Sequence, residues 1–156
     1  MAWRVERILQ RKRQLRGGFI VTSRPTWEEY ALQLAEVAAK RSEDIYRKVG
    51  SVALDHENRV IGVAYNGLSH GKNVGPEFWV DRDQRRKFMI HAETNLLSLI
   101  KRGECKLLAC TLLPCTACAN AIAAHNIPKV VYRELYDKDQ SALEIFKFHN
   151  IELKQI

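Results

Sequence analysis

Hydrophobic and polar positions in the first part of the chain follow two different periods. From Thr26 onward, apolar residues recur at three- and four-residue spacing, which predicts a helix with one buried face. The apolar positions of that helix are Trp27, Tyr30, Ala31, Leu34, Val37 and Ala38. Thr26 and Glu29 form a capping-box pattern that opens it. Two runs rich in β-branched residues follow, at 49–54 and 59–65, and the polar segment between them predicts an antiparallel hairpin.

The second half of the chain alternates predicted helices and strands. Helices are expected at 92–101, 115–125 and 141–149, and strands at 106–113, 129–133 and 151–154. The segment 66–89 exceeds the usual length of a loop, so it is expected to be functional or mobile, with part of it helical. A helix between two strands permits them to be parallel, which predicts that the last two strands are parallel. The pattern therefore predicts an α/β domain with three layers, α/β/α, around a five-stranded mixed sheet.

Most of the chain's positive charge lies at its beginning. The 156 residues carry a net charge of +7, and residues 1–24 hold seven Lys and Arg against the single acid Glu6. We interpret 1–24 as a basic N-terminal extension and 25–156 as one domain, because the chain is long enough for one ordinary core. No apolar run approaches the roughly 18 residues that span a bilayer. We therefore expect a cytoplasmic protein without a membrane partner.

Two short motifs carry metal-ligand chemistry, His91-Ala92-Glu93 and the cysteine pair that follows Pro114. One imidazole, from His91, and two thiolates, from Cys115 and Cys118, are ligands that zinc prefers. Three protein ligands leave the fourth tetrahedral position open, as in catalytic sites. At i and i+3 of a first helical turn the two cysteines point the same way, and the helix N-terminus favours their thiolate forms. We expect one zinc ion per chain, held by these three residues.

Glu93 is the expected catalytic residue. In a regular helix its side chain would point away from that of His91, so this role requires an irregular helix start. Its carboxylate would then move protons from the attacking water to the substrate. A closed structural zinc site is the alternative, and it requires a fourth ligand such as Cys105 or Cys110. The short third strand favours these two cysteines as core or surface thiols.

From Trp27 to the C-terminus the sequence resembles the deoxycytidylate deaminase family of the cytidine deaminase superfamily. The segments that carry the resemblance are Trp27-x-x-Tyr30, Arg41-Ser42-Glu43-Asp44, Lys48-Val49-Gly50, Tyr65-Asn66-Gly67, His91-Ala92-Glu93-Thr94-Asn95, Pro114-Cys115-x-x-Cys118 and Tyr136-Asp137-Lys138-Asp139. The resemblance implies a cytidine deaminase-like fold and zinc-dependent hydrolysis of dCMP to dUMP and ammonia. It also implies that Asn66 hydrogen-bonds the sugar. Further substrate contacts are expected from Ser42, Lys48, Ala92 and Tyr136.

The resemblance further implies a homo-oligomer and leaves a deoxynucleoside triphosphate effector open. Two other functions remain as alternatives. A deaminase of cytidine or adenosine in tRNA or single-stranded nucleic acid uses the same zinc ligands, and residues 1–24 would contact its phosphates. The nearly neutral charge of residues 25–156 disfavours that alternative, so nucleic acid is expected as a partner only through the extension. A non-catalytic interaction module stabilised by zinc is the third candidate.

Overall fold

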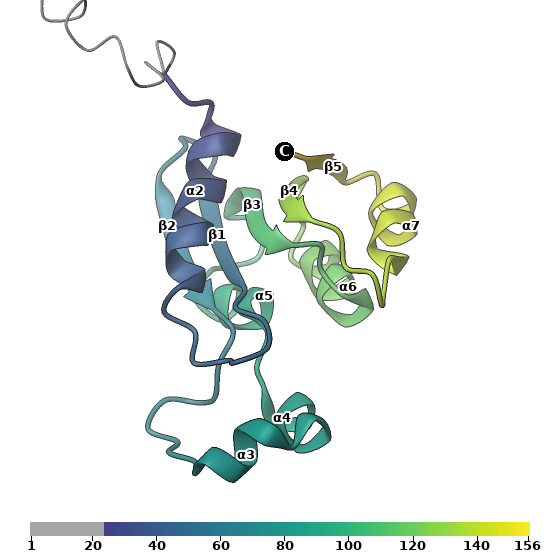
Figure 1. Ribbon diagram of the computed structural model, residues 1–156. Helices are drawn as coiled ribbons and strands as arrows, with labels where there is room; N and C mark the ends of the chain where they lie inside the picture. Colours follow the sequence, from purple (N-terminus) through teal and green to yellow (C-terminus); the bar gives the residue numbers. More distant parts are fainter. Residues whose placement is uncertain (1–23) are drawn as a thin grey trace, which may run out of the picture.

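A computed structural model describes residues 24–156 (Figure 1). Residues 1–23, nearly all of the predicted N-terminal extension, lie outside the described residues. Five strands form one sheet in the order β2-β1-β3-β4-β5. They are β1 (Gly50–Asp55), β2 (Val60–Tyr65), β3 (Cys105–Leu112), β4 (Lys129–Glu134) and β5 (Glu152–Gln155). The helices are α2 (Trp27–Ala39), α3 (Pro76–Val80), α4 (Arg82–Phe88), α5 (Ala92–Leu97), α6 (Thr116–Ala124) and α7 (Ser141–Phe148).

The sheet is mixed, as the sequence predicted. Strand β1 pairs antiparallel with β2 and with β3, whereas β3, β4 and β5 are parallel. Helices α6 and α7 make the two crossovers that parallel neighbours require. The predicted hairpin and the predicted parallel pairing of the last two strands are therefore both confirmed. Asn58 makes the hairpin turn with a positive φ of 63°, a conformation that asparagine tolerates better than most residues.

Helices cover both faces of the sheet. Helix α2 packs on one face, against residues of β1, β3 and β4. Helices α5, α6 and α7 pack on the other face, where Leu96, Ile122 and Phe146 are fully buried. The predicted three-layer α/β/α architecture is confirmed (Figure 1). Among residues 24–156, no helix combines the length and the apolar character that crossing a bilayer requires.

Helix α2 is rotated relative to the face that the sequence predicted. Its start is as expected, because the Thr26 hydroxyl accepts the N–H of Glu29 while the Glu29 carboxylate accepts the N–H of Thr26. The predicted burial of Trp27, Tyr30 and Val37 is wrong, since all three side chains are exposed. The buried positions are Ala31, Leu32, Ala35, Ala38 and Ala39.

The reason for the rotation is a close approach between the backbones of α2 and β1. A Cβ atom at Gly50 would lie 2.0 Å from the carbonyl oxygen of Ala35 and 2.7 Å from the amide nitrogen of Ala39. Only small residues fit between a helix and a strand at this separation. Alanines therefore face the sheet, and the larger Trp27 and Val37 are turned outward, which their hydrophobicity alone does not reveal.

The segment between β2 and α5 contains two short helices, α3 and α4, so the expectation of partial helix there is confirmed. In Figure 1 this segment projects beyond the end of the sheet. Helix α5 ends at Leu97, earlier than the predicted residue 101. A tight turn at Gly103, with a positive φ of 82°, follows before β3 begins.

Replacing Gly50 with Ala is expected to destabilise the fold by about 3 kcal/mol, because overpacking here meets backbone that cannot move aside. Urea unfolding followed by circular dichroism measures the free energy of unfolding. The matched control is Gly67→Ala, where a Cβ atom meets only Tyr65, at 4.0 Å, and the expected change is under about 1 kcal/mol. Parent-like stability of Gly50→Ala would contradict the close approach.

Candidate active site

The N-termini of α5 and α6 meet at one edge of the sheet. His91 is the N-cap of α5 and Cys115 is the N-cap of α6, and both have extended backbone, with ψ of 151° and 169°. An N-cap side chain folds back over the third helical residue. Cys118 occupies that position in α6, so both thiols point to the same place. Pro114 precedes the N-cap, so the helical turn starts at Thr116 and not at the proline, and Cys115 stands just outside the predicted helix 115–125.

The three predicted zinc ligands converge. The Nδ1 atom of His91 lies 3.5 Å from the Sγ of Cys115 and 3.4 Å from the Sγ of Cys118. Zinc bonds of about 2.1 Å to nitrogen and 2.3 Å to sulfur, at tetrahedral angles, separate the two donors by about 3.6 Å. The donor spacing therefore fits a zinc ion. Within residues 24–156, these three residues form the one His, Cys, Asp and Glu group that is compact enough to hold a metal ion.

The charges of the two thiols depend on each other. Hydrogen bonds from Cys118 and from His91 lower the pKa of Cys115 to about 4. The neighbouring Cys115 thiolate, together with burial, raises the pKa of Cys118 far above its usual range. Contact with Cys115 also raises the pKa of the His91 imidazole. Without a metal, the pair therefore favours one thiolate, on Cys115, and one neutral thiol, on Cys118. A divalent cation bound to both sulfur atoms removes the charge repulsion that opposes ionisation of the second thiol.

Glu93 lies beside these ligands. Its side chain is buried, and it lines a cavity of about 420 Å³ together with His91 and Cys115. Because His91 stands outside the helical repeat, the irregular helix start that this placement requires is present. Burial raises the pKa of the Glu93 carboxyl. A carboxyl shifted in this direction can hold a proton at higher pH than an exposed one, as a proton-transfer group must.

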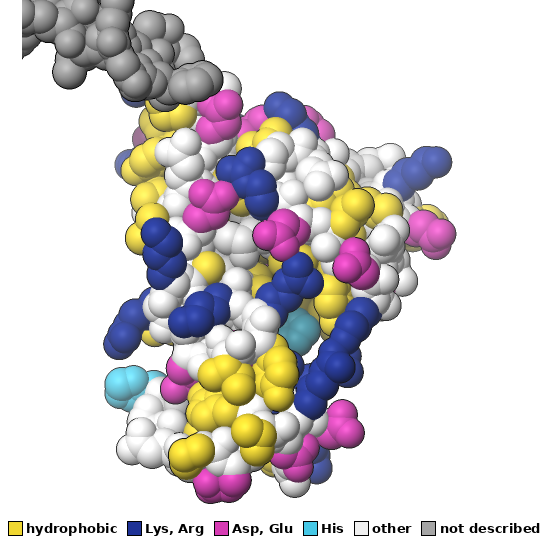
Figure 2. Space-filling model, viewed as in Figure 1, with side chains coloured by type: hydrophobic (Ala, Val, Ile, Leu, Met, Phe, Trp, Pro, Cys, Tyr) yellow, Lys and Arg dark blue, Asp and Glu magenta, His cyan; other side chains and the backbone are white. Residues whose placement is uncertain are grey.

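Basic side chains surround the mouth of this cavity. Figure 2 shows Lys and Arg, in dark blue, around the hollow between the main body and the α3–α4 segment. Arg47, Arg86 and Lys138 line the cavity. Arg47 pairs with Glu134 at 2.7 Å, whereas Arg86 and Lys138 form no salt bridge within the described part of the chain. Arg86 and Lys138 are therefore available to bind an anion. The nearly neutral net charge of residues 25–156 did not reveal this local positive charge.

Asn66 lines the cavity, but most of its amide is already paired within the chain. Its Oδ1 accepts the N–H of Val49 at 2.8 Å, and its Nδ2 donates to the Arg47 carbonyl at 2.9 Å and to the Asp44 carboxylate at 3.2 Å. One lone pair of Oδ1 remains, which could accept a sugar hydroxyl. The contact between Asn66 and the sugar stays a prediction.

The other predicted substrate contacts divide into two groups. Ala92 and Tyr136 line the cavity. Ser42 and Lys48 do not line it. Ser42 is buried, and its hydroxyl donates to the Asn66 carbonyl at 2.8 Å, whereas Lys48 is exposed. Ser42 thus helps to fix the backbone of Asn66, and direct contacts of Ser42 and Lys48 with a substrate stay predictions.

Asp139 fixes the turn that carries the cysteines, a role that the sequence analysis missed. Its carboxylate accepts the N–H of Thr116 at 2.7 Å and the Thr116 hydroxyl at 2.8 Å. It also accepts the N–H of Ser141, at 3.1 Å. These bonds, led by that from the Thr116 backbone, lower the pKa of Asp139 to about 2. The loop after β4 therefore holds the first turn of α6 in place, a pairing distant in sequence that no local pattern predicts.

The remaining cysteines belong to the core. Cys105 and Cys110 are buried in the hydrophobic cluster on the α5–α7 face. Burial raises the pKa of Cys105 to about 12 and that of Cys110 well above its usual range. Neither thiol belongs to the cluster of possible metal ligands that His91, Cys115 and Cys118 form within the described residues. Of the two expected locations, core or surface, the structure shows the core for both thiols.

Sequence comparison matches residues 25–134 to the cytidine and deoxycytidylate deaminase zinc-binding region. The deoxycytidylate deaminase of Saccharomyces cerevisiae is 34% identical over 142 residues, which cover 85% of this chain and 45% of the yeast protein. That of Mycobacterium phage D29 is 36% identical over 126 residues, which cover 70% of this chain and 96% of the phage protein. The chain thus spans less than half of the yeast relative and nearly all of the phage relative.

Solved structures show the same fold. The dCMP deaminase of cyanophage S-TIM5, in complex with dCMP and dUMP, matches with a TM-score of 0.71 and 22% identity. The match covers 86% of this chain and 99% of the cyanophage chain. The predicted cytidine deaminase-like fold is therefore confirmed.

A double variant, Cys115→Ser with Cys118→Ser, is expected to lose its zinc, because a hydroxyl does not replace a thiolate as a ligand. Inductively coupled plasma mass spectrometry of desalted protein measures the ratio of zinc to chain. The control is Cys105→Ala with Cys110→Ala, which removes two thiols of the core and should keep the zinc. Full zinc occupancy in the serine variant would refute the ligand assignment.

Proposed function

This chain belongs to the cytidine and deoxycytidylate deaminase family, and from that premise we propose that it hydrolyses the exocyclic amine of a cytosine nucleotide, dCMP. Water adds at C4 of the base, the C4–N bond breaks, and dUMP and ammonia are released. The observation that carries the proposal is the position of buried Glu93 in the same cavity as the zinc-ligand cluster. A structural zinc site does not require a buried carboxyl beside the metal, whereas hydrolysis requires a group that transfers protons.

His91, Cys115 and Cys118 would hold the zinc, since their spacing and chemistry fit it. When bound, zinc supplies the Lewis acidity that makes water a competent nucleophile near neutral pH. Glu93 accepts a proton from the attacking water and delivers it to the ring nitrogen N3. It then accepts the proton of the new C4 hydroxyl and passes it to the amine, which leaves as ammonia while the C4 carbonyl forms. Its burial excludes bulk water from these transfers.

The cavity also accounts for a nucleotide substrate. Its volume of about 420 Å³ lies in the range of small-molecule sites. Arg86 and Lys138 are exposed lining residues that form no salt bridge within the described residues, and they can bind a phosphate. A nucleoside lacks that group and would leave both cations unused. The positive mouth thus favours dCMP over deoxycytidine.

Several further properties are part of this proposal. We infer a cytoplasmic location and a homo-oligomer, and we leave a deoxynucleoside triphosphate effector open. A deaminase of tRNA or single-stranded nucleic acid remains the second candidate, because the basic mouth of the cavity also suits a phosphate within a polynucleotide. An assay with both kinds of substrate separates the two functions.

The test compares the full chain with its Glu93→Gln variant on dCMP, deoxycytidine, CMP and a cytosine-containing oligonucleotide, with ammonia release as the readout. The parent is expected to act most efficiently on dCMP. Glu93→Gln keeps the size of the side chain and should retain zinc, but turnover should fall by about 10²–10⁴-fold or more because proton transfer is lost. Near-parent turnover of this variant would remove Glu93 from the mechanism. Preference for the oligonucleotide would replace the proposed substrate by the second candidate.

Arg86→Met is expected to raise the KM for dCMP by roughly tenfold or more, because a hydrogen bond to a charged group contributes about 1.5–3 kcal/mol. The kcat/KM for deoxycytidine should change little, since that substrate has no phosphate to lose. Lys87→Met is the control, because Lys87 neighbours Arg86 on α4 and does not line the cavity. Equal loss on dCMP and deoxycytidine would show that Arg86 does not recognise the phosphate.

A further inference from the structure

Helices α3 and α4 are attached to the domain by very little hydrophobic contact. Helix α3 buries no residue, and the one buried residue of α4 is Arg85. Of its large apolar side chains, Val80 and Phe88 are exposed, and Phe78 and Trp79 are half-buried. A segment of this kind is not positioned by a packed core. Polar contacts attach it instead: the Tyr46 hydroxyl donates to the Val80 carbonyl at 3.4 Å, a backbone bridge joins Gly67 to Ile90 just after α4, and Arg85 binds the loop before β1.

The guanidinium of Arg85 has two partners in the loop between α2 and β1. Its Nη1 forms a salt bridge with the carboxylate of Asp44, which is 2% exposed. Its Cζ lies 4.6 Å from the centre of the Tyr46 ring, the geometry of a cation–π contact. Its Nε is buried without a hydrogen-bond partner within residues 24–156. Asp44 and Tyr46 are therefore the contacts that hold this side chain.

Asp44 connects Arg85 to the wall of the active-site cavity. Its Oδ1 accepts the N–H groups of Tyr46 at 2.8 Å and Arg47 at 3.2 Å. Its Oδ2 accepts the amide of Asn66 at 3.2 Å as well as the guanidinium. A buried carboxylate with this many donors is rigidly held. Arg85 is thus clamped to a fixed point of the domain, beside residues that line the cavity.

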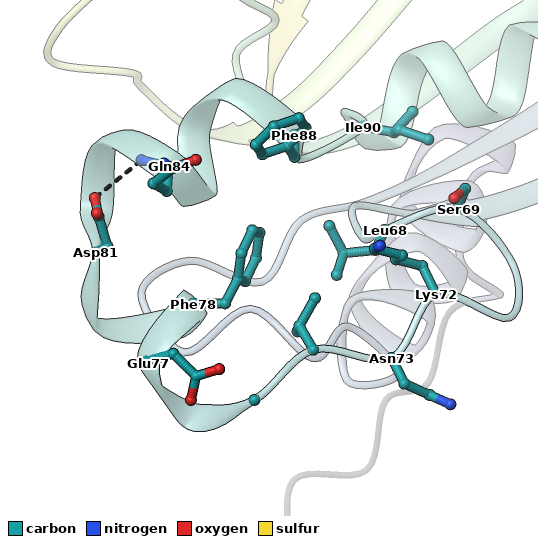
Figure 3. Close-up of a pocket in the computed structure, with 12 residues that line it drawn as sticks. Leu68, Ser69, Lys72, Asn73, Glu77, Phe78, Asp81, Gln84, Phe88 and Ile90 are labelled. Atoms are coloured by element: carbon teal, nitrogen blue, oxygen red, sulfur yellow. Dashed lines mark hydrogen bonds between the residues drawn. The ribbon is translucent and has the colours of Figure 1, made fainter.

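Helix α4 forms a wall between two cavities. Gln84 and Phe88 line a second cavity, of about 760 Å³, which none of the metal ligands lines, and Figure 3 shows both side chains there. Arg85, Arg86 and Met89 line the cavity that contains the metal ligands. Because open space lies on both sides, neighbouring side chains do not fix the helix by close packing. The backbone bridge between Gly67 and Ile90 holds the chain just after Met89. The placement of Arg86, one turn earlier, then depends on Arg85.

We propose that Arg85 is a positioning residue that docks α4 on Asp44 and thereby holds Arg86 at the phosphate end of the active-site cavity. The part of this inference that concerns the phosphate rests on the proposed function. The docking itself does not, because it follows from the contacts between Arg85, Asp44 and Tyr46 alone. Arg85 touches no reacting atom in this scheme and acts through the position of α4.

The experiment measures the position of α4 directly. Hydrogen exchange of residues 76–88, followed by mass spectrometry, is compared for the full-length parent, Arg85→Met, Asp44→Asn and the control Arg82→Met. Arg82 is an exposed arginine of the same helix that lines neither cavity. We expect about tenfold or more faster exchange in Arg85→Met and Asp44→Asn, as for a segment that opens locally, and parent-like exchange in Arg82→Met. Parent-like exchange in Arg85→Met would overturn the proposal.

Kinetics supply the second readout. Arg85→Met should raise the KM for dCMP by about tenfold, as expected when one charge-assisted hydrogen bond is lost. Its kcat and its zinc content should stay close to those of the parent, because Glu93 and the metal ligands are untouched. A fall in kcat with unchanged KM would contradict a positioning role. The double variant Arg85→Met/Asp44→Asn should be no worse than either single one, since both remove the same contact.

Two further results distinguish a failure of the variant to fold, or of the proposed function, from a failure of the docking proposal. Where Arg85→Met does not fold, Arg85→Lys keeps the charge but lacks the planar group that pairs with Asp44 and stacks on Tyr46, and intermediate exchange is expected. Parent-like exchange in a folded Arg85→Lys would then count against the stacked geometry. A parent without activity on dCMP would refute the proposed function, while the exchange data would still decide whether Arg85 docks α4.

Discussion

The active-site cavity depends on the meeting of two helix N-termini at one edge of the sheet. Helix α5 leads away from that edge, β3 returns to it, and α6 begins where β3 ends, so His91 and Cys115 come together although 24 residues separate them. Parallel strands place their carboxyl ends, and the loops that follow them, at the same edge. The positive ends of both helix dipoles therefore point into one cavity, where they favour thiolates and a carboxylate.

The buried polar groups of the described residues gather at this cavity. The buried polar and charged residues are Ser42, Asp44, Ser51, Asn66, Arg85 and Glu93. Asp44 and Asn66 bond each other, and the Ser51 hydroxyl donates to the Ala92 carbonyl at 2.8 Å beside the metal ligands. Burying such groups destabilises a fold unless they are paired. Their concentration here indicates that they are kept for the geometry of the cavity, whereas the rest of the core is apolar.

Sequence patterns correctly predicted the features that depend on interactions between residues close together in the chain. The capping box at Thr26, the hairpin and the thiol pair at Cys115 each depend on residues a few positions apart, and all three formed as expected. The orientation of α2 could not be predicted, because it follows from the contact of Ala35 with Gly50 across two elements. The docking of Arg85 on Asp44 joins residues 41 positions apart. The net charge of the chain does not reveal such a pair, because the opposite charges of Arg85 and Asp44 cancel in the sum.

X-ray absorption spectroscopy at the zinc edge, on the full chain loaded with one zinc equivalent, tests the central claim most directly. The account predicts two sulfur neighbours at about 2.3 Å and two lighter neighbours, nitrogen or oxygen, at about 2.0–2.1 Å. The second lighter neighbour should be exchangeable, so that a competitive inhibitor carrying a basic nitrogen alters the spectrum. Three or four sulfur neighbours, or a spectrum that no ligand changes, would mean a closed structural site and would contradict the account.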